Sequence, residues 1–407
     1  MQPATSTTIA SCYVKANGTQ AFSYVGDDQR LYQLIQQGDP DSAWQTIDVI
    51  AQWQSIANIT PPFPRTGTGP RGDGPVVMNT FEAMAGFFLC YIDQNNHVQV
   101  LPYPIDDSTY APPGWPAGGS LAAALYPDIT ARTGAPPAAP SSGIACYAWE
   151  SQQSQHVVYV GEDGNVWELY WIVGQYDGTR GGPLWKCNNL SAATGFTGVL
   201  GPNMKNGSIA ATMFERENSE HVIYIAGDNT IRELYFYNDR WGGNDLSEAT
   251  GAKPPAANAA LATFAANYED TLHVLYFGQD DAVHELWWGN GGWQPDHTVS
   301  SSKPAVGTAL VGYASEDEQV HHVIYIDVNN DIQEDYHNSG GWSNTTLSFS
   351  AGSGATPPLS TASPLAGNSA AYYDDGQSQH VFYLDDQTRV HELYRFNDQW
   401  IAGETSG

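Results

Sequence analysis

The amino-acid sequence predicts an all-β fold, a seven-bladed β-propeller of four-stranded antiparallel blades. Three observations lead to this fold class. A short motif recurs seven times along the 407 residues, and each copy lies in a unit that reads as four short strands. Turn formers are frequent, with 41 Gly and 25 Pro, and aromatic residues make up 12% of the chain. A period of roughly 50 residues with four strands per unit is typical of propellers.

The repeated motif is clearest in five copies, for example "HVLYFGQDDAVHELWW" from His273. The other four clear copies begin at His156, His221, His322 and His380. Two degenerate copies begin at Ala21 and Phe88. With starts near 21, 88, 156, 221, 273, 322 and 380, the copies extend along the whole chain. We therefore expect residues 1–407 to form a single propeller domain with one blade per copy.

Each unit is expected to contain four strands in a fixed order. The first is rich in small residues, as in "ALATFAA" at 260–266, which suits a crowded centre where blades converge. The second and third, such as "HVLYFG" and "AVHELWW", are β-formers joined by a turn of Asp, Asn and Gly, as in a hairpin. The fourth begins at a Trp and ends in a polar loop such as 244–257.

The charge balance argues against several kinds of partner. The chain has 15 Lys and Arg against 44 Asp and Glu, a net charge of −29. Such a surface repels phosphate backbones, so we expect no nucleic-acid partner. No apolar run approaches the roughly 18 residues that a membrane span requires, so we expect no membrane insertion. The start of the chain lacks the pattern of a signal peptide. We expect a cytoplasmic protein, or one released without a classical signal peptide.

The four cysteines are Cys12, Cys90, Cys146 and Cys187. Cys12 and Cys146 occupy the same place in two copies of the repeat that a third copy separates. We therefore expect all four to be buried free thiols and not a disulfide framework.

A His and a Glu recur with the motif. Each of the five histidines that begin a clear copy is followed twelve residues later by a glutamate, and these are Glu168, Glu233, Glu285, Glu334 and Glu392. Facing strands bring such residues close, so the pair could simply stabilise its own hairpin. Five equivalent pairs are unlike an enzyme, which sets one acid and one base in different environments. One His and one Glu per blade also fall short of a zinc site. We expect no enzyme, no metal and no cofactor.

A repeated recognition site is the interpretation that the pattern favours. Polar side chains bind sugar hydroxyls, and aromatic faces pack against sugar C–H groups. The pattern "xVxYxxxDxxIxELxxxxxxGW" resembles the fungal fucose-specific lectins of the Aleuria type and the related seven-bladed Photorhabdus lectins. The resemblance implies a sugar between adjacent blades. One blade would supply an arginine on strand two and the glutamate twelve residues later. The next blade would supply an aromatic residue and a tryptophan three and eight residues after its own glutamate.

Carried onto this sequence, the resemblance implies five crevices, with His in place of the family's arginine. Crevice A, between blades three and four, would combine His156, Glu168, Phe236 and Trp241. Crevice B, between blades four and five, would combine His221, Glu233, Trp288 and Trp293. Crevice C, between blades five and six, would combine His273, Glu285, His337 and Trp342. Crevice D, between blades six and seven, would combine His322, Glu334, Arg395 and Trp400. Crevice E would place His380 and Glu392 against blade one.

The sequence thus predicts a multivalent lectin for fucose or a related deoxy or O-methylated sugar. Its partners would be fucosylated or methylated glycans on cell surfaces, with host interaction or defence as the role. Self-association into a homo-oligomer stays open. A protein-interaction scaffold without sugar binding is the main alternative.

Overall fold

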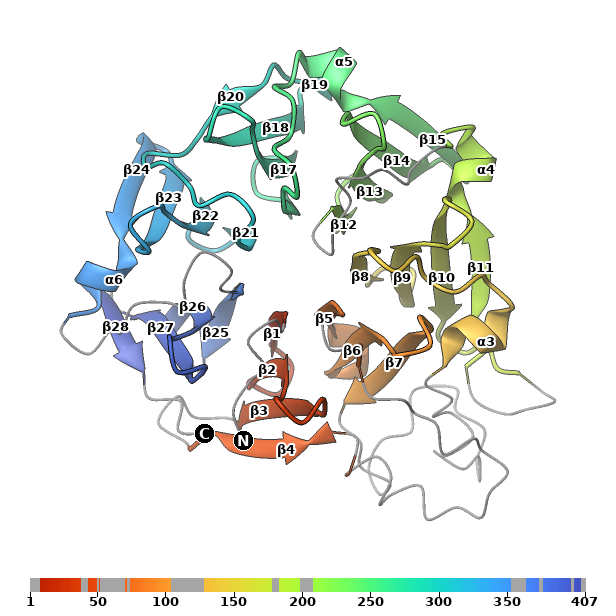
Figure 1. Ribbon diagram of the computed structural model, residues 1–407, viewed down its shortest axis with the longest axis horizontal. Coiled ribbons are helices and arrows are strands. Elements are labelled where there is room, and N and C mark those ends of the chain that lie inside the picture. The colour runs from red at the N-terminus through yellow and green to blue at the C-terminus, as the bar shows by residue number, and fades with distance from the viewer. Residues whose placement is uncertain are drawn as a thin grey trace.

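Seven β-sheets are arranged in a ring in the computed structural model, with the first strand of each sheet near the centre (Figure 1). The structure describes residues 8–37, 43–49, 51, 70–71, 74–103, 128–177, 183–197, 208–352, 364–372, 376–396 and 399–403. The predicted fold class, a seven-bladed propeller of antiparallel sheets, is confirmed.

The first four blades follow one another along the chain. Blade one contains β1 (Ile9–Val14), β2 (Thr19–Val25), β3 (Leu31–Gln37) and β4 (Gln45–Asp48). Blade two contains β5 (Val76–Phe81), β6 (Gly86–Ile92) and β7 (Val98–Tyr103). Blade three contains β8 (Ile144–Trp149), β9 (Ser154–Val160), β10 (Val166–Ile172) and β11 (Lys186–Asn189). Blade four contains β12 (Ile209–Phe214), β13 (Ser219–Ile225), β14 (Ile231–Tyr237) and β15 (Arg240–Asp245).

The last three blades complete the ring. Blade five contains β16 (Leu261–Ala266), β17 (Thr271–Phe277) and β18 (Val283–Gly289), with its outer strand in two pieces, β19 (Gly292–Trp293) and β20 (His297–Thr298). Blade six contains β21 (Leu310–Ser315), β22 (Val320–Ile326), β23 (Ile332–Asn338) and β24 (Gly341–Thr346). Blade seven contains β25 (Leu365–Tyr372), β26 (Gly376–Leu384), β27 (Val390–Phe396) and β28 (Gln399–Gly403).

Each sheet is built from strands that are consecutive in the sequence. In all seven sheets the chain passes from the central strand outward, and blade two has three strands among the described residues. Every predicted repeat start lies on the second strand of its blade. The ring closes where blade seven meets blade one, because Ile9, Phe22 and Tyr24 form one apolar cluster with Phe382 and Leu384. The described sheets therefore exchange no strand at closure.

The packing between sheets is apolar and repeats from blade to blade. A tyrosine three residues after each repeat start is at most 2% exposed. These residues are Tyr24, Tyr91, Tyr159, Tyr224, Tyr276, Tyr325 and Tyr383. Because side chains alternate between the two faces of a strand, the tyrosine points away from the face that carries the repeat's histidine. In blades three to seven, one face of the sheet thus carries the buried His–Glu pair and the other face carries the buried tyrosine.

Close packing near the centre explains the small residues on strand one. A Cβ atom added at Gly312 on β21 would lie 2.6 Å from Leu275 Cδ1 and 3.0 Å from the Phe264 ring of blade five. We expect Gly312→Ala to lower the free energy of unfolding by about 1–2 kcal/mol, since neighbouring side chains must shift. Gly292→Ala is the matched control, because nothing lies within 4 Å of its added Cβ. Equal denaturation midpoints for the two variants would show that the centre is not tightly packed.

The loop expected at 244–257 is partly a helix. Asn244 and Asp245 end β15, and α5 (Leu246–Thr250) follows. The Asp245 side chain caps this helix by accepting a hydrogen bond from the Glu248 N–H, and Leu246 is fully buried. Comparable short helices are α3 (Ile129–Thr133), α4 (Leu190–Thr194) and α6 (Leu347–Ser350). Four or five residues are too few to show a helical period, so the sequence pattern did not reveal them.

The cysteines are free thiols, as the sequence predicted, but only two are buried. Cys12 and Cys90 are buried, and burial raises the pKa of both thiols. Cys146 and Cys187 are half-buried, so the expectation of four buried thiols was wrong for these two. Among the residues that the structure describes, none of the helices has the length and apolar character needed to cross a bilayer.

Candidate functional site

The histidine and glutamate of each clear repeat lie on neighbouring strands and on the same face of the sheet. In blade four, His221 is directly opposite Tyr235, which follows Glu233 by two residues. The pair is therefore diagonal across the hairpin and not directly opposite. This geometry repeats because His is always on strand two and Glu is always the third residue of strand three.

All five predicted His–Glu pairs are hydrogen bonded. The distances from His Nδ1 to Glu Oε1 are 2.8 Å for His156, 2.7 Å for His221, 2.8 Å for His273, 2.8 Å for His322 and 2.6 Å for His380. None of the ten side chains belongs to a residue more than 7% exposed. The pairs thus stabilise their own hairpins, which was one of the two roles that the sequence left open.

The second oxygen of several of these glutamates faces outward, toward strand four and the next blade. Asn188 donates to Glu168 Oε2 at 2.8 Å and Asn244 to Glu233 Oε2 at 2.6 Å. In crevice B the Trp293 indole donates to Glu233 Oε2 at 3.1 Å, and in crevice D Trp400 donates to Glu334 Oε2 at the same distance. In these two crevices the predicted tryptophan therefore does meet the carboxylate of the preceding blade.

Crevice D contains a cavity of about 620 Å³. All four residues predicted for this crevice line it, namely His322, Glu334, Arg395 and Trp400, together with residues such as Val320 and Thr345. The other four histidines of the set use Nε2 in a hydrogen bond to a Ser or Thr two residues earlier. Blade six has Val320 at that place, and His322 Nε2 has no hydrogen-bond partner among the described residues.

In crevices A and B, further side chains contact the predicted residues. In crevice A, Glu220 of blade four reaches the pair, with Oε2 3.6 Å from His156 Nδ1. Phe236 and Trp241 pack on each other with ring centroids 5.5 Å apart. In crevice B, Trp288 packs edge-on against Trp293 at 6.1 Å and donates to Glu217.

Crevices C and E differ again. In crevice C, His321 lies with its ring centroid 4.2 Å from that of His273, and His337 packs on Trp342 at 5.3 Å. His297 Nε2 lies 2.9 Å from Glu285 Oε2. In crevice E, Gly403 is opposite Glu392, and Trp44 of blade one packs edge-on against Phe382 at 5.8 Å. Blades one and two have no such pair, because Ala21 and Phe88 replace the histidine.

Three acidic groups near the pairs have shifted pKa values. Burial alone would raise the pKa of Glu168 and Glu285, but the hydrogen bonds and charge of their histidines outweigh it. The pKa of Glu168 is lowered, and that of Glu285 falls to about 2. Burial and the nearby Glu168 charge raise the pKa of Glu220 well above its ordinary value of 4.5. The two neighbouring carboxyl groups of crevice A thus have pKa values shifted in opposite directions.

The raised pKa of Glu220 leads to a prediction. The folded protein holds this proton at pH values where the unfolded chain has released it, so Glu220 destabilises the fold as pH rises above 4.5. Glu220→Gln is expected to be at least as stable as the wild type at pH 8, by up to about 1 kcal/mol. The difference should shrink toward pH 4, as urea unfolding at several pH values will test. A Gln variant that is much less stable at pH 8 would show that Glu220 is ionised when folded.

Several residues near the sites were not found from the sequence. Asn188, Asn244 and His297 lie opposite the glutamates on the outer strand. Glu220 and His321 precede the repeat's histidine by one residue and contact the previous blade. Alternation along strand two could have indicated that these last two point toward the preceding blade.

Comparisons with known proteins agree with this architecture. A family model described as "Fungal fucose-specific lectin" matches residues 192–406, just over half of the chain. No curated protein sequence matches the chain.

Solved structures show the fold. A lectin of Burkholderia pseudomallei is 15% identical, with 99% of each chain covered and a TM-score of 0.64. AofleA of Arthrobotrys oligospora is 12% identical over 98% of this chain and 87% of its own, with a TM-score of 0.52. A mutant of the Aleuria aurantia lectin, solved in complex with α-methyl-L-fucoside, is 14% identical over 85% and 96%, with a TM-score of 0.51.

Proposed function

The chain belongs to the fungal fucose-specific lectin family, and we propose that it is a multivalent lectin whose sugar sites are the crevices between adjacent blades. Its ligand is fucose or a related deoxy or O-methylated sugar on cell-surface glycans. It acts by binding and not by catalysis. The family match and the lectins of similar fold support carbohydrate binding. The identity of the sugar and the location of its sites are proposed here from the geometry of the crevices.

The cavity in crevice D is the observation that carries the proposal. His322 Nδ1 bonds Glu334, His322 Nε2 has no hydrogen-bond partner among the described residues, and Glu334 Oε2 is an acceptor that also lines the cavity. Two neighbouring sugar hydroxyls could donate to these two atoms. Arg395 adds a donor, and Val320 with Trp400 adds an apolar wall for a methyl group and ring C–H bonds. This combination suits a deoxy sugar.

The crevices are not equivalent. They differ in whether the strand-four residue opposite the glutamate already forms a hydrogen bond to its second oxygen. Asn188, Asn244 and His297 already bond the second oxygen in crevices A, B and C. In crevices D and E the opposite residues are Thr345 and Gly403. We infer that D and E bind sugar most readily and that A, B and C bind more weakly. Several sites on one ring would give avidity toward dense glycans.

A glycan array of the wild-type protein, followed by calorimetry with α-methyl-L-fucoside, tests the proposed function. Binding confined to fucosylated or O-methylated glycans supports it. Absence of binding to every glycan would favour the alternative of a protein-interaction scaffold, in which the His–Glu pairs serve only their own hairpins.

A substitution at Thr345, which lies opposite Glu334, tests the proposed site by giving Glu334 Oε2 a competing hydrogen-bond donor. Thr345→Asn places in blade six the side chain that bonds the glutamate in blades three and four. We expect it to weaken binding in crevice D about 5- to 10-fold, since the sugar must displace a hydrogen bond to the carboxylate. Stability should change little. Ser343→Asn, at an exposed position on the same strand, is the control and should bind as the wild type does. Unchanged affinity in Thr345→Asn would place the sugar elsewhere.

A further inference from the structure

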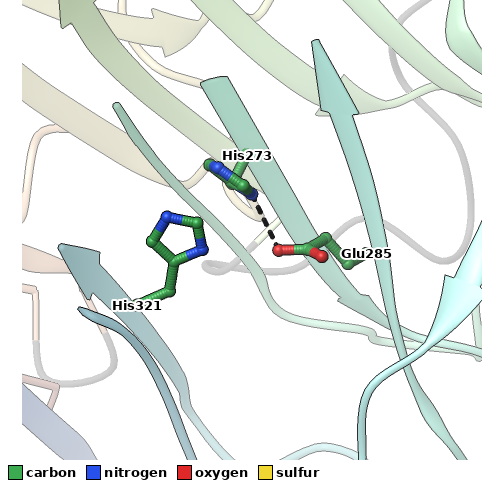
Figure 2. Close-up of side chains that lie close together, drawn as sticks. All are labelled: His273, Glu285 and His321. Carbon is green, nitrogen blue, oxygen red and sulfur yellow. Dashed lines mark hydrogen bonds and ion pairs between the residues drawn. The ribbon is translucent and has the colours of Figure 1, made fainter. Parts of the chain in front are cut away.

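Three buried side chains from two blades converge in crevice C (Figure 2). Each of His273, Glu285 and His321 offers one ligand atom, and these atoms all lie within 4.8 Å of one another. His273 and Glu285 belong to blade five, and His321 reaches them from β22 of blade six. We propose that these three residues bind one divalent transition-metal ion, with Zn²⁺ the best match.

His321 is the side chain that makes crevice C different from the others. The residue is 2% exposed, and its Nε2 has no hydrogen-bond partner among the described residues. Figure 2 shows that the other ring nitrogen, Nδ1, is the one turned toward Glu285, so Nδ1 is the atom that would bind the ion. The other six repeats have no histidine at this place, where they carry Gln20, Phe87, Gln155, Glu220, Leu272 and Gln379. The Nε2 atom is therefore buried without a hydrogen bond, and Glu269 Oε2, 3.6 Å away, is the acidic group that the structure places near it.

Groups around the three residues are placed as outer partners of metal ligands usually are. His273 Nε2 is 2.8 Å from Thr271 Oγ1, so this hydroxyl oxygen can accept a hydrogen bond from Nε2–H and leave Nδ1 for the metal. His297 Nε2 holds the other oxygen of Glu285 at 2.9 Å. Glu269 Oε2 lies 3.6 Å from His321 Nε2. Metal-bound imidazoles and carboxylates are commonly oriented by such second contacts.

The donor set favours transition metals. Two imidazoles and one carboxylate are a known zinc ligand set in which a fourth position stays open for water. Tetrahedral ligands at about 2.1 Å from zinc lie about 3.4 Å apart. His273 Nδ1 and Glu285 Oε1, now 2.8 Å apart, must therefore separate, while any ligand atoms that are up to 4.8 Å apart must approach. Nitrogen donors disfavour Mg²⁺ and Ca²⁺.

The comparable cluster in crevice A differs in its third member. Glu220 Oε2 already accepts a hydrogen bond from the Tyr147 hydroxyl at 2.7 Å, and burial and the Glu168 charge raise the pKa of its carboxyl, so it is a poorer ligand than an imidazole. We therefore expect one ion per chain. The sequence predicted no metal because each blade alone supplies one His and one Glu, whereas here the third ligand comes from the next blade.

Calorimetry with ZnCl₂ on the untagged full chain, stripped with a chelator and free of sugar, tests the proposal. We expect one site per chain, binding at least 10-fold weaker in His321→Gln, and no binding of Mg²⁺ or Ca²⁺. Gln is the residue of three other blades at this place, so the variant should fold, and its melting temperature without metal checks this. His97→Gln, in blade two, should bind Zn²⁺ as the wild type does. Unchanged binding in His321→Gln, or none in the wild type, would overturn the proposal.

Anomalous scattering at the zinc edge locates the ion without any variant. The proposal requires a peak between His273, Glu285 and His321, and a peak only on the acidic surface would refute it. Because no sugar is present in either measurement, failure of the metal site leaves the lectin function untouched.

Discussion

Replacing Glu233 by alanine is expected to lower the free energy of unfolding by about 3–5 kcal/mol, because breaking a buried polar pair leaves its partners unsatisfied. Three donors meet on this carboxylate: His221 Nδ1 at 2.7 Å, the Asn244 amide at 2.6 Å and the Trp293 indole at 3.1 Å. They come from two strands of blade four and from blade five. The residue is 1% exposed, so little water can replace the lost acceptor.

Two further variants make this result interpretable. Glu233→Gln keeps one acceptor oxygen but turns a donor toward Asn244 and Trp293, so we expect a loss between those of the wild type and the alanine variant. Glu162→Ala removes an exposed glutamate and should change stability by less than about 0.5 kcal/mol. Urea denaturation midpoints measure all three. If Glu233→Ala and Glu162→Ala behaved alike, the pairs would not stabilise the blades.

Glu334→Gln is expected to abolish measurable sugar binding in crevice D. An ionised acceptor contributes roughly 1.5–3 kcal/mol to a hydrogen bond, which corresponds to a 10- to 100-fold loss of affinity. The amide that replaces Oε2 also turns a donor toward the Trp400 indole, which now donates to that oxygen at 3.1 Å. In calorimetry with α-methyl-L-fucoside, the number of sites per chain should fall by one.

The control for Glu334→Gln is a second Glu→Gln substitution, which removes the same charge at a position far from Glu334 in sequence. Glu248→Gln removes a carboxylate from the exposed face of α5 and should leave both the number of sites and their affinity unchanged. An equal loss of binding in both variants would point to a general effect of net charge. Full binding by Glu334→Gln would show that the sugar does not bind to Glu334 in crevice D.

The fold was predictable because each blade is specified by a short sequence motif, and this motif recurs along the chain. Each copy of the motif places a hairpin, and seven copies with small residues on the first strand define the ring. The His–Glu pair was predictable for the same reason, since twelve residues across one hairpin fix a diagonal contact such as that of His221 with Glu233. The tryptophan eight residues after the glutamate entered through resemblance to a family, and Trp293 and Trp400 do contact the preceding carboxylate.

Contacts that depend on the width of a crevice were not predictable. His321 meets His273 only because blades five and six pack closely, and no spacing within one repeat encodes that distance. In blades four, six and seven the residue three positions after the Trp lies opposite the glutamate, but the interrupted outer strand of blade five places His297, and not Asp296, opposite Glu285. The cavity in crevice D is lined by Val320 and Thr345. Val320 replaces the Ser or Thr that bonds the histidine Nε2 in blades three, four, five and seven, and Thr345 replaces the Asn that bonds the second glutamate oxygen in blades three and four.

The most direct test of the account is a crystal structure of the protein soaked with α-methyl-L-fucoside. We expect sugar density between blades six and seven, with hydroxyls within hydrogen-bond distance of His322 Nε2 and Glu334 Oε2 and the sugar ring against Trp400. Sugar bound only in the central channel or on outer loops, with crevice D holding water alone, would contradict it.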